Sequence, residues 1–255
     1  MGMLDGHRAL ITGAGRGLGL AMAEAYARAG ARVLMQDMDL KVAEGEAARL
    51  KKEGLAVATI GGDVTADKDV AAIFAFLDKE WGGIDILVNN AGVSANREVL
   101  ALPLEQWDRT MAVNLRAPLV LAQEAGRRMV PRKSGNIVNI SSIWGLMAAP
   151  GRIAYCVSKA AIAQMTRCLA DEWAPHGIRV NAIAPGYTES KMLRDVINAG
   201  KVDEGKLHRR TPMGRFGTPQ EIADMALFLV SPQSTFVTGQ VIAVDGGWTA
   251  YGLYS

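Results

Sequence analysis

The sequence has few of the residues on which metal sites, disulfide frameworks and hydrolytic triads depend. It contains only two cysteines, Cys156 and Cys168, which one helix would separate by about 18 Å along its axis. That distance exceeds disulfide reach, so we expect two free thiols. The three histidines and two cysteines form no metal-ligand pattern, and the G-x-S-x-G motif of α/β hydrolases is absent. These absences argue against a dedicated metal site and against a hydrolase.

Excess charge and long apolar runs are also missing. The net charge is +2, with basic and acidic residues interspersed, so no electrostatic surface for nucleic acid or an anionic membrane is evident. No apolar run approaches the roughly 18 residues of a membrane span, and no charged-then-apolar leader precedes the first predicted strand. We therefore expect a soluble, cytoplasmic protein that binds a small-molecule substrate, with neither nucleic acid nor membrane as a partner.

The composition, 49% hydrophobic and 21% charged residues, fits one sizeable α/β domain over residues 1–255. Apolar runs predict strands at 8–11, 32–36, 56–60, 84–88, 136–140, 178–183 and 240–244. Helical segments are predicted at 21–29, 40–52, 67–80, 104–129 with a bend at Pro118, 153–173 and 219–229. This alternation predicts a Rossmann-type, doubly wound parallel sheet with helices on both faces, which binds ligands at the carboxyl ends of its strands.

A glycine-rich turn, Gly13, Gly17 and Gly19 in the spacing G-x-x-x-G-x-G, joins the first strand to the first helix. Glycines let a backbone pass close to a ligand, and the free amides at a helix start attract phosphate. The turn is therefore a candidate pyrophosphate site. The alternative interpretation is a tight connection that binds no ligand.

Asp37 ends the second predicted strand, eighteen residues after Gly19. An acid there can accept both ribose hydroxyls of an adenosine and would repel a 2′-phosphate, which favours NAD over NADP. Arg16, within the glycine turn, could contact that phosphate, but we give Asp37 more weight. Asp37 could also serve as a turn or capping residue before the next helix.

Tyr155 and Lys159 lie at positions i and i+4 of the predicted helix 153–173 and so share one face. A free tyrosine titrates near ~10, so a neighbouring cation is needed to favour phenolate at neutral pH. Ser142 follows the fifth strand and could present its hydroxyl to the same ligand. Taken alone, the Tyr155 and Lys159 pair could equally be an accidental surface pair.

Three further segments are less specific. Residues 89–92, Asn-Asn-Ala-Gly, lie at a strand end, where they are either a ligand loop or an ordinary turn. Asn114 falls inside a predicted helix, where a capping or solvent-facing role is the alternative. Residues 187–214 look irregular and charged, apart from one short apolar-faced piece at Met192, Leu193, Val196 and Ile197. We interpret them as a substrate lid, with a solvated excursion as the alternative. The basic run 208–210 within them could meet an anionic substrate, although such runs are more often solvated.

Together these stretches resemble the short-chain dehydrogenase/reductase family over essentially the whole chain. The family's T-G-x-x-x-G-x-G turn corresponds to residues 12–19, its N-N-A-G to residues 89–92 and its Y-x-x-x-K to Tyr155 and Lys159. Its catalytic serine and asparagine correspond to Ser142 and Asn114. The resemblance implies the strand order 3-2-1-4-5-6-7 and commonly a homotetramer.

The resemblance also implies how the residues act. Tyr155 would exchange the proton of the substrate hydroxyl, Lys159 would lower the tyrosine pKa and hold the nicotinamide ribose, and Ser142 would hydrogen-bond the substrate oxygen. Asn114 would hold a water that links Lys159 to solvent. Ser190 stands where the family often has threonine, and its hydroxyl should keep that contact. The implied cofactor contacts are Gly13, Arg16, Gly17, Leu18, Gly19, Asp37, Asp63, Val64, Asn90, Ala91, Gly92, Tyr155, Lys159, Pro185, Gly186, Thr188 and Ser190.

We therefore predict an NAD-dependent oxidoreductase that transfers hydride between nicotinamide and a secondary alcohol or ketone of the polyol, sugar or hydroxy-acid type. The substrate would contact Ser94, Ser142, Trp144, Tyr155 and Tyr187. An NADPH-dependent reductase of 3-oxoacyl thioesters is the first alternative, and Asp37 argues against it. A nucleotide-sensing protein without chemistry is the second, and the presence of Ser142, Tyr155 and Lys159 together argues against that.

Overall fold

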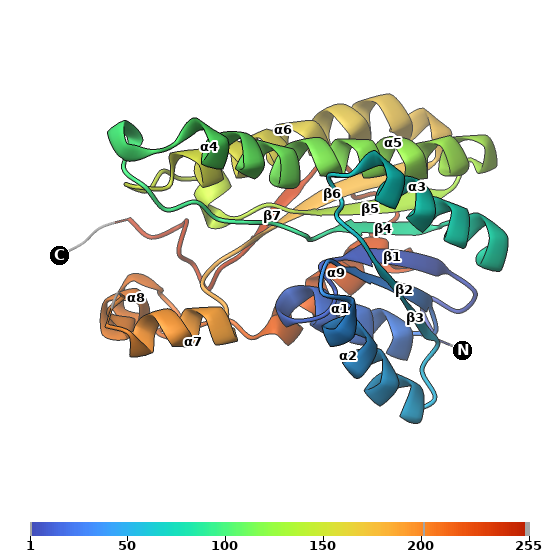
Figure 1. Ribbon diagram of the computed structural model, residues 1–255, viewed down its shortest axis with the longest axis horizontal. Coiled ribbons are helices and arrows are strands. Elements are labelled where there is room, and N and C mark those ends of the chain that lie inside the picture. Colours follow the sequence, from blue (N-terminus) through green and yellow to red (C-terminus); the bar gives the residue numbers. More distant parts are fainter. Residues whose placement is uncertain (1, 201, 253–255) are drawn as a thin grey trace.

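The computed structural model describes residues 2–200 and 202–252 and shows a parallel sheet between two layers of helices (Figure 1). The sheet has seven strands in the order β3-β2-β1-β4-β5-β6-β7, and every neighbouring pair is parallel. This order and the doubly wound class confirm the prediction. The strands are β1 Arg8–Thr12, β2 Arg32–Asp37, β3 Val57–Gly61, β4 Ile86–Asn89, β5 Gly135–Ile140, β6 Ile178–Pro185 and β7 Val241–Val244.

Each face of the sheet is covered by helices (Figure 1). One face carries α3 Asp67–Phe76, α4 Leu104–Met111, α5 Ala117–Met129 and α6 Ile153–Trp173; the other carries α1 Gly17–Arg28, α2 Leu40–Lys52 and α9 Pro219–Val230. Short 3-10 helices are η2 Val99–Ala101, η4 Val130–Arg132, η5 Ile143–Gly145, η6 Ala174–His176 and η7 Pro232–Ser234. Within the described chain, none of the helices has the length and apolar character to cross a membrane.

The apolar runs of the strands are explained by two separate cores. Adjacent residues of β1 point to opposite faces: Leu10 packs into the core with Phe74 and Leu121, and Ile11 packs into the core with Met22 and Tyr26. Because a parallel sheet is buried on both faces, its strands read as continuous rather than alternating apolar runs. This double burial makes the edge where the strands end the accessible place for a ligand.

The helix predicted over residues 104–129 is interrupted. Between α4 and α5 the chain forms a π-helical turn, η3 Ala112–Arg116, and Pro118 is the second residue of α5. The bend predicted at Pro118 therefore lies immediately after a wider turn that the sequence did not reveal. A second π turn, η1 Leu77–Trp81, follows α3. Single π turns inside helices often accompany functional residues, and η3 contains Asn114.

The segment predicted to be irregular contains two helices, α7 Lys191–Asn198 and α8 Glu204–Arg210. Both begin with side-chain caps: the Ser190 hydroxyl accepts from the backbone N–H of Leu193 at 3.1 Å, and the Asp203 carboxylate accepts from Lys206 at 3.0 Å. The two helices lie to one side of the layered body (Figure 1). The expectation of an irregular chain here was wrong, because these caps satisfy the first amides of both short helices.

Candidate active site

Ser142, Tyr155 and Lys159 lie at the carboxyl edge of β5. The strand ends at Ile140, Ser142 follows two residues later, and α6 brings Tyr155 and Lys159 back to the same edge. The ammonium nitrogen of Lys159 lies 5.7 Å from the centre of the Tyr155 ring. The i, i+4 spacing therefore brings phenol and ammonium together, as the sequence predicts.

Two hydrogen bonds fasten α6 to the end of β5. Lys159 Nζ donates to the carbonyl oxygen of Ile140 at 2.7 Å, and Ser141 Oγ donates to the carbonyl oxygen of Lys159 at 2.8 Å. Gly145 permits this approach, because a Cβ there would lie 2.6 Å from the Lys159 carbonyl oxygen. The sequence places Ser141 at the strand end beside Ser142 but gives it no separate role.

The charge environment differs from the one expected from the sequence. Burial raises the pKa of Tyr155 above its ordinary value, although a hydrogen bond with Ser142 and the nearby charge of Arg152 both lower it. Burial lowers the pKa of Lys159 to about 8. The net shift of the Tyr155 pKa is thus upward, because desolvation disfavours phenolate more than these neighbours favour it. The lowering of the Tyr155 pKa by Lys159 stays a prediction.

Asn114 is buried and faces inward rather than capping a helix or facing solvent. Its Nδ2 donates to Val93 O at 2.9 Å and to Ser158 Oγ at 3.1 Å, and its Oδ1 accepts from Val93 N at 2.8 Å. Ser158 in turn donates to the carbonyl oxygen of Tyr155 at 2.8 Å. A Cβ at Gly92 would lie 3.4 Å from Asn114 Oδ1 and 3.5 Å from Lys159 Nζ. Asn114 therefore connects the loop after β4 to the helix that carries Tyr155 and Lys159.

The glycine turn fits a phosphate group. Gly13 and Gly17 have φ values of +63° and +57°, and nothing lies within 4 Å of the position that a Cβ of Gly17 would occupy. Arg16 precedes α1 without a side-chain cap, so the first amides of the helix stay available for an anion. A Cβ at Gly19 would instead collide with the Gly13 carbonyl, so that glycine is needed for the fold itself. Leu18 packs against the adjacent core.

The residues after β4 support this turn. Asn90 Nδ2 donates to the carbonyl oxygens of Thr12 at 2.8 Å and Gly13 at 3.1 Å, and the backbone N–H of Ala91 donates to Thr12 Oγ1 at 3.1 Å. The side chain of Asn90 thus holds the glycine turn in place. Its predicted contact with the cofactor stays a prediction.

Asp37 and Arg16 meet at the far end of the glycine turn. The Asp37 carboxylate accepts from the backbone N–H groups of Gly15 and Asp39, each at 2.9 Å. Arg16 pairs with Asp39 at 3.2 Å, and both of these side chains are exposed. Asp37, which favours NAD, and Arg16, which could favour NADP, therefore lie close together. Asp39, which the sequence did not single out, forms the ion pair with Arg16.

The other predicted cofactor contacts lie along the same edge. Asp63 follows β3, where its carboxylate accepts from the backbone and hydroxyl of Thr65 at 2.9 and 2.8 Å, and Val64 is buried. Pro185 ends β6, and Gly186 is needed because a Cβ there would lie 2.7 Å from Asp245 Cα.

Thr188 and Ser190, the last two predicted cofactor contacts, form hydrogen bonds through their hydroxyl groups to nearby backbone. Thr188 donates to the Gly186 carbonyl oxygen at 3.2 Å, and the Ser190 oxygen caps α7. The Ser190 proton stays available for a ligand, since the cap uses only the oxygen as acceptor. Neither placement tests the expected contact with the nicotinamide carboxamide.

Three aromatic side chains adjoin the Ser142 turn. The ring centres of Trp144 and Tyr187 are 6.4 Å apart, those of Trp144 and Trp248 are 6.1 Å apart, and those of Tyr187 and Trp248 are 5.0 Å apart. We call Trp144, Tyr187 and Trp248 the aromatic cluster. Trp248 was not predicted, because only the folded chain brings its turn after β7 here. Ser94 is exposed and donates to Asn96 within its own loop at 3.1 Å.

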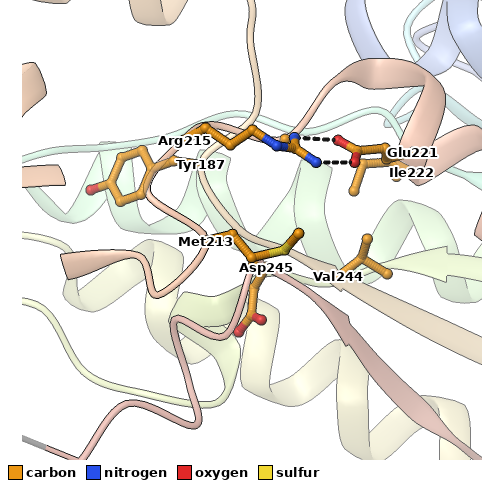
Figure 2. A pocket seen from close by; sticks show the side chains of 9 residues that line it. Tyr187, Met213, Arg215, Glu221, Ile222, Val244 and Asp245 are labelled. Carbon is orange, nitrogen blue, oxygen red and sulfur yellow. Dashed lines mark hydrogen bonds and ion pairs between the residues drawn. The ribbon is translucent and has the colours of Figure 1, made fainter. Parts of the chain in front are cut away.

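A small cavity of about 90 Å³ lies on the other side of Tyr187, between the loop after β6 and the start of α9. Figure 2 shows Arg215 and Glu221 facing one another at one side of it, joined by hydrogen bonds of 2.6 and 2.9 Å, and the Asp245 carboxylate turned away from them. Neither Ser142 nor Tyr155 lines this cavity, which holds only a few waters' volume. This cavity is therefore too small to be the substrate site, and it lacks the reacting groups.

A larger hollow of about 670 Å³ lies at the opposite edge of the sheet, where it is lined by residues that include His7, Asn136 and Arg179. These precede or begin strands, whereas parallel sheets bind ligands where strands end. Across the described part of the chain, no group of three His, Cys, Asp or Glu side chains is placed to hold a metal ion. The strand order and the groups at the carboxyl edge thus define a Rossmann-type oxidoreductase.

Comparison with known proteins agrees with this class. A family model described as Enoyl-(Acyl carrier protein) reductase matches residues 13–249. A 2-(S)-hydroxypropyl-CoM dehydrogenase of Xanthobacter autotrophicus is 40% identical over 94% of this chain and 95% of its own. The gluconate 5-dehydrogenase of Gluconobacter oxydans is 38% identical over 96% of both chains. The NAD-dependent glycerol dehydrogenase of Listeria innocua is 40% identical over 94% of this chain and 93% of its own.

Among solved structures, a gluconate 5-dehydrogenase from Burkholderia cenocepacia in complex with NADP and tartrate superposes with a TM-score of 0.92. It is 38% identical and covers 98% of this chain and 97% of its own. The present chain belongs to the short-chain dehydrogenase/reductase family. It is an oxidoreductase that acts on alcohol groups with a nicotinamide cofactor.

Proposed function

We propose that the protein is an NAD-dependent oxidoreductase for secondary alcohols and ketones of the polyol, sugar or hydroxy-acid type, with Tyr155 as general acid and base. One observation carries the proposal: Ser142, Tyr155 and Lys159 converge at the carboxyl edge of β5, and Lys159 is fixed there by its 2.7 Å hydrogen bond to Ile140. A sensing protein would have no need of this arrangement.

The roles follow from the hydrogen-bonding capacity of each group. Tyr155 takes the proton of the substrate hydroxyl during oxidation and returns it during reduction. Ser142, which acts to lower the pKa of Tyr155, donates to the substrate oxygen and stabilises its developing charge. When bound, the nicotinamide cofactor supplies the hydride acceptor or donor.

Lys159 and Asn114 act around this pair. Lys159 uses one of its three N–H groups on Ile140, so two others can donate to the nicotinamide ribose and to a water. Asn114 has both amide hydrogens and one Oδ1 lone pair engaged, which leaves a second lone pair beside Gly92 and Lys159 for that water. We propose this water as the route by which Lys159 exchanges protons with solvent.

The preference for NAD rests on Asp37. Its carboxylate lies beside the glycine turn, where it would accept ribose hydroxyls and repel a 2′-phosphate, whereas Arg16 is held by Asp39. The relative from Listeria is named as NAD-dependent, and the Burkholderia structure contains NADP, so relatives use both cofactors. The negative charge at Asp37 is the feature of this chain that favours NAD.

The named substrates of the relatives support the proposed class. Gluconate is a sugar acid and glycerol a polyol, and the corresponding relatives match nearly the whole chain. We propose further that the segment 187–214, with α7 and α8, is a lid over the substrate, since it directly follows the loop that carries Tyr187. The homotetramer implied by the family resemblance is part of the same proposal, and light scattering tests it.

The test compares wild type with Tyr155→Phe on a panel of polyols, aldonates, the matching ketones and 3-oxoacyl thioesters, with the oxidised and reduced forms of both NAD and NADP. The variant should lose turnover by about 100-fold or more, since a positioned acid or base contributes 10² to 10⁴ in rate. It should bind NADH as wild type does, which nicotinamide fluorescence measures. Retained turnover would remove Tyr155 from the chemistry. Activity restricted to NADPH and 3-oxoacyl thioesters would replace the proposed reaction with the alternative reductase.

A further inference from the structure

Arg152 is a cation without a carboxylate partner beside the candidate active site. Within residues 2–200 and 202–252, its side chain makes neither an ion pair nor a hydrogen bond. Two arginines of the segment after β6 are paired: Arg194 with Glu189 and Glu204, and Arg215 with Glu221. The five N–H donors of the Arg152 guanidinium are therefore available to a ligand.

The backbone fixes where this cation stands. Arg152 immediately precedes α6, and its carbonyl oxygen accepts the N–H of Cys156 at 2.8 Å, so it lies one helical turn before Tyr155. Gly151, in the turn just before, has a φ of +69°, and its carbonyl accepts the N–H of Arg97 at 2.8 Å. Arg152 thus extends from an anchored position rather than from a free loop.

The side chain of Arg152 reaches the aromatic cluster. Its guanidinium carbon lies 5.8 Å from the centre of the Trp144 ring, and Trp144 packs edge-on against Tyr187. The positive charge of Arg152 also acts to lower the pKa of Tyr155 and of Tyr187, although burial raises both overall. Trp144 lies two residues after Ser142, so the cation adjoins the groups that would bind the reacting alcohol.

The carboxylates of Glu189 and Asp245 have partners other than Arg152. Glu189 is paired with Arg194, and Asp245 accepts from Gly247 at 2.9 Å and from Thr249 at 2.8 and 2.6 Å. The site therefore combines groups that bind a hydroxyl with a guanidinium, that of Arg152, which has no carboxylate partner among the described residues. A neutral polyol would leave that guanidinium without a counter-charge.

We propose that Arg152 recognises a carboxylate of the substrate, so that the substrate is a hydroxy acid in which the reacting secondary alcohol and the carboxylate share one carbon skeleton. A guanidinium can bind a carboxylate through two parallel hydrogen bonds, which fixes orientation as well as affinity. The inference rests on the proposed function and narrows its substrate class from polyols, sugars and hydroxy acids to hydroxy acids.

Arg210 is the rival for this role. Its guanidinium carbon lies 4.7 Å from the Trp248 ring centre and 4.6 Å from that of Tyr251, and it also lacks a carboxylate partner among the described residues. Arg210 differs in that it already donates to the carbonyl oxygen of Trp248 at 2.9 Å. Its charge has no resolved effect on Tyr155. These differences favour Arg152.

The experiment measures binding without turnover. D-gluconate and D-sorbitol, and separately D-glycerate and glycerol, are titrated by calorimetry into enzyme saturated with NADH, to which an alcohol cannot transfer hydride. Each pair differs by a terminal carboxylate in place of a CH₂OH group. The proteins are wild type, Arg152→Met, Arg152→Lys and Arg210→Met, with Arg167→Met as the control. That control removes an exposed arginine of α6, the helix that Arg152 precedes.

Wild type should bind the acid of at least one pair more tightly than its neutral partner. Arg152→Met should weaken binding of that acid by about 10- to 100-fold and change the neutral partner by less than about 2-fold, because only a hydrogen bond to charge is lost. Arg152→Lys should recover part of the affinity, and Arg167→Met should behave as wild type.

Three results would overturn the assignment: wild type shows no preference for the acid in either pair, Arg152→Met weakens acid and alcohol equally, or Arg210→Met alone abolishes the preference. Failure of the proposed function is a separate result. Retained turnover in Tyr155→Phe would remove the mechanism and leave a positive binding result at Arg152 intact. In turnover assays, Arg152→Met should raise KM for the acid more than it lowers kcat.

Discussion

The ammonium group of Lys159 donates a 2.7 Å hydrogen bond to the carbonyl oxygen of Ile140, the last residue of β5. The adjacent Ser141 returns a 2.8 Å hydrogen bond to the carbonyl of Lys159. Because both bonds join the end of one strand to one turn of α6, they set the rotation of that helix and hence the direction of Tyr155. The Lys159 side chain that donates this bond is buried.

Burial of Lys159 should make stability depend on pH. Its pKa is lowered from 10.5 to about 8, so between these values the unfolded chain binds a proton that the native protein does not. The free energy of unfolding of wild type, relative to Lys159→Met, should therefore rise with pH, by about 1.5 kcal/mol between pH 8 and pH 9.5. Urea unfolding of both cofactor-free proteins across this interval measures it. A difference that stays constant or falls would show that the ammonium is not desolvated.

Ser142→Ala should separate rate from stability. Loss of a donor to the substrate oxygen should lower kcat by about 10² to 10³, or roughly 3 kcal/mol of transition-state stabilisation. The hydrogen bond from Ser142 also lowers the pKa of Tyr155, so the residual oxidation should reach its plateau at higher pH than in wild type. Steady-state pH profiles in the oxidative direction measure both effects.

Ser141→Ala is the matched control for this prediction. It removes the neighbouring hydroxyl that bonds Lys159 O and keeps Ser142, so it should cost about 1 kcal/mol of unfolding free energy. It should leave the alkaline limb of the pH profile where wild type has it. Equal kinetic losses in the two variants would contradict the role given to Ser142.

Asp37→Ser should change cofactor selectivity. The substitution removes the charge that repels a 2′-phosphate and the acceptor for ribose hydroxyls, so affinity for NADH should fall while affinity for NADPH rises. We expect the ratio of the two dissociation constants to change by about 100-fold, corresponding to roughly 3 kcal/mol. Nicotinamide fluorescence at one ionic strength gives both constants.

Arg16→Met is the companion variant, because Arg16 is an exposed base in the glycine turn that could contact a 2′-phosphate. It should weaken NADPH binding more than NADH binding. Since Asp37 also accepts from Gly15 and Asp39, thermal unfolding of Asp37→Ser must be followed alongside. Unchanged constants in a folded Asp37→Ser would show that Arg16, and not Asp37, governs the choice.

Gly19→Ala should destabilise the folded protein for steric reasons, even without cofactor. A Cβ there would lie 2.6 Å from Asn90 Nδ2 and collide with the Gly13 carbonyl, so we expect a loss of about 3 kcal/mol, the upper range for overpacking. Gly45→Ala, in the interior of α2 with nothing within 4 Å, should gain about 0.5 to 1 kcal/mol. Chemical unfolding compares them. Similar stabilities for the two variants would contradict the close packing of the turn on Asn90.

The strands and the glycine turn were predictable because local patterns determine them. Leu10 and Ile11 face different cores, which a run of apolar residues already indicates. The π turn that contains Asn114 was not predictable, since helical spacing does not show where a helix widens. The two helices after Ser190 were missed although their caps, Ser190 and Asp203, were visible signals before short charged segments.

Some residues of the site were likewise predictable from local sequence, and others depend on tertiary structure. Spacing alone placed Tyr155 and Lys159 on one face, and strand order placed Ser142 beside them. The isolation of Arg152 depends on where Glu189 and Asp245 find their partners, which only tertiary structure decides. Trp248 joins the aromatic cluster from a turn far along the chain. Local chemistry was therefore predictable, and the absence of a compensating charge was not.

The two ends of the segment that contains α7 and α8 meet at a single point. Glu189 N donates to Gly217 O at 2.8 Å, and Gly217 N donates to Tyr187 O at 2.9 Å. The stretch between them therefore starts and ends at the same place beside the sheet. Because closing a loop costs little more as it lengthens, evolution or a protein engineer can exchange this insert for a longer or shorter one. The sheet and the Ser142, Tyr155 and Lys159 constellation then remain as a constant frame for different substrates.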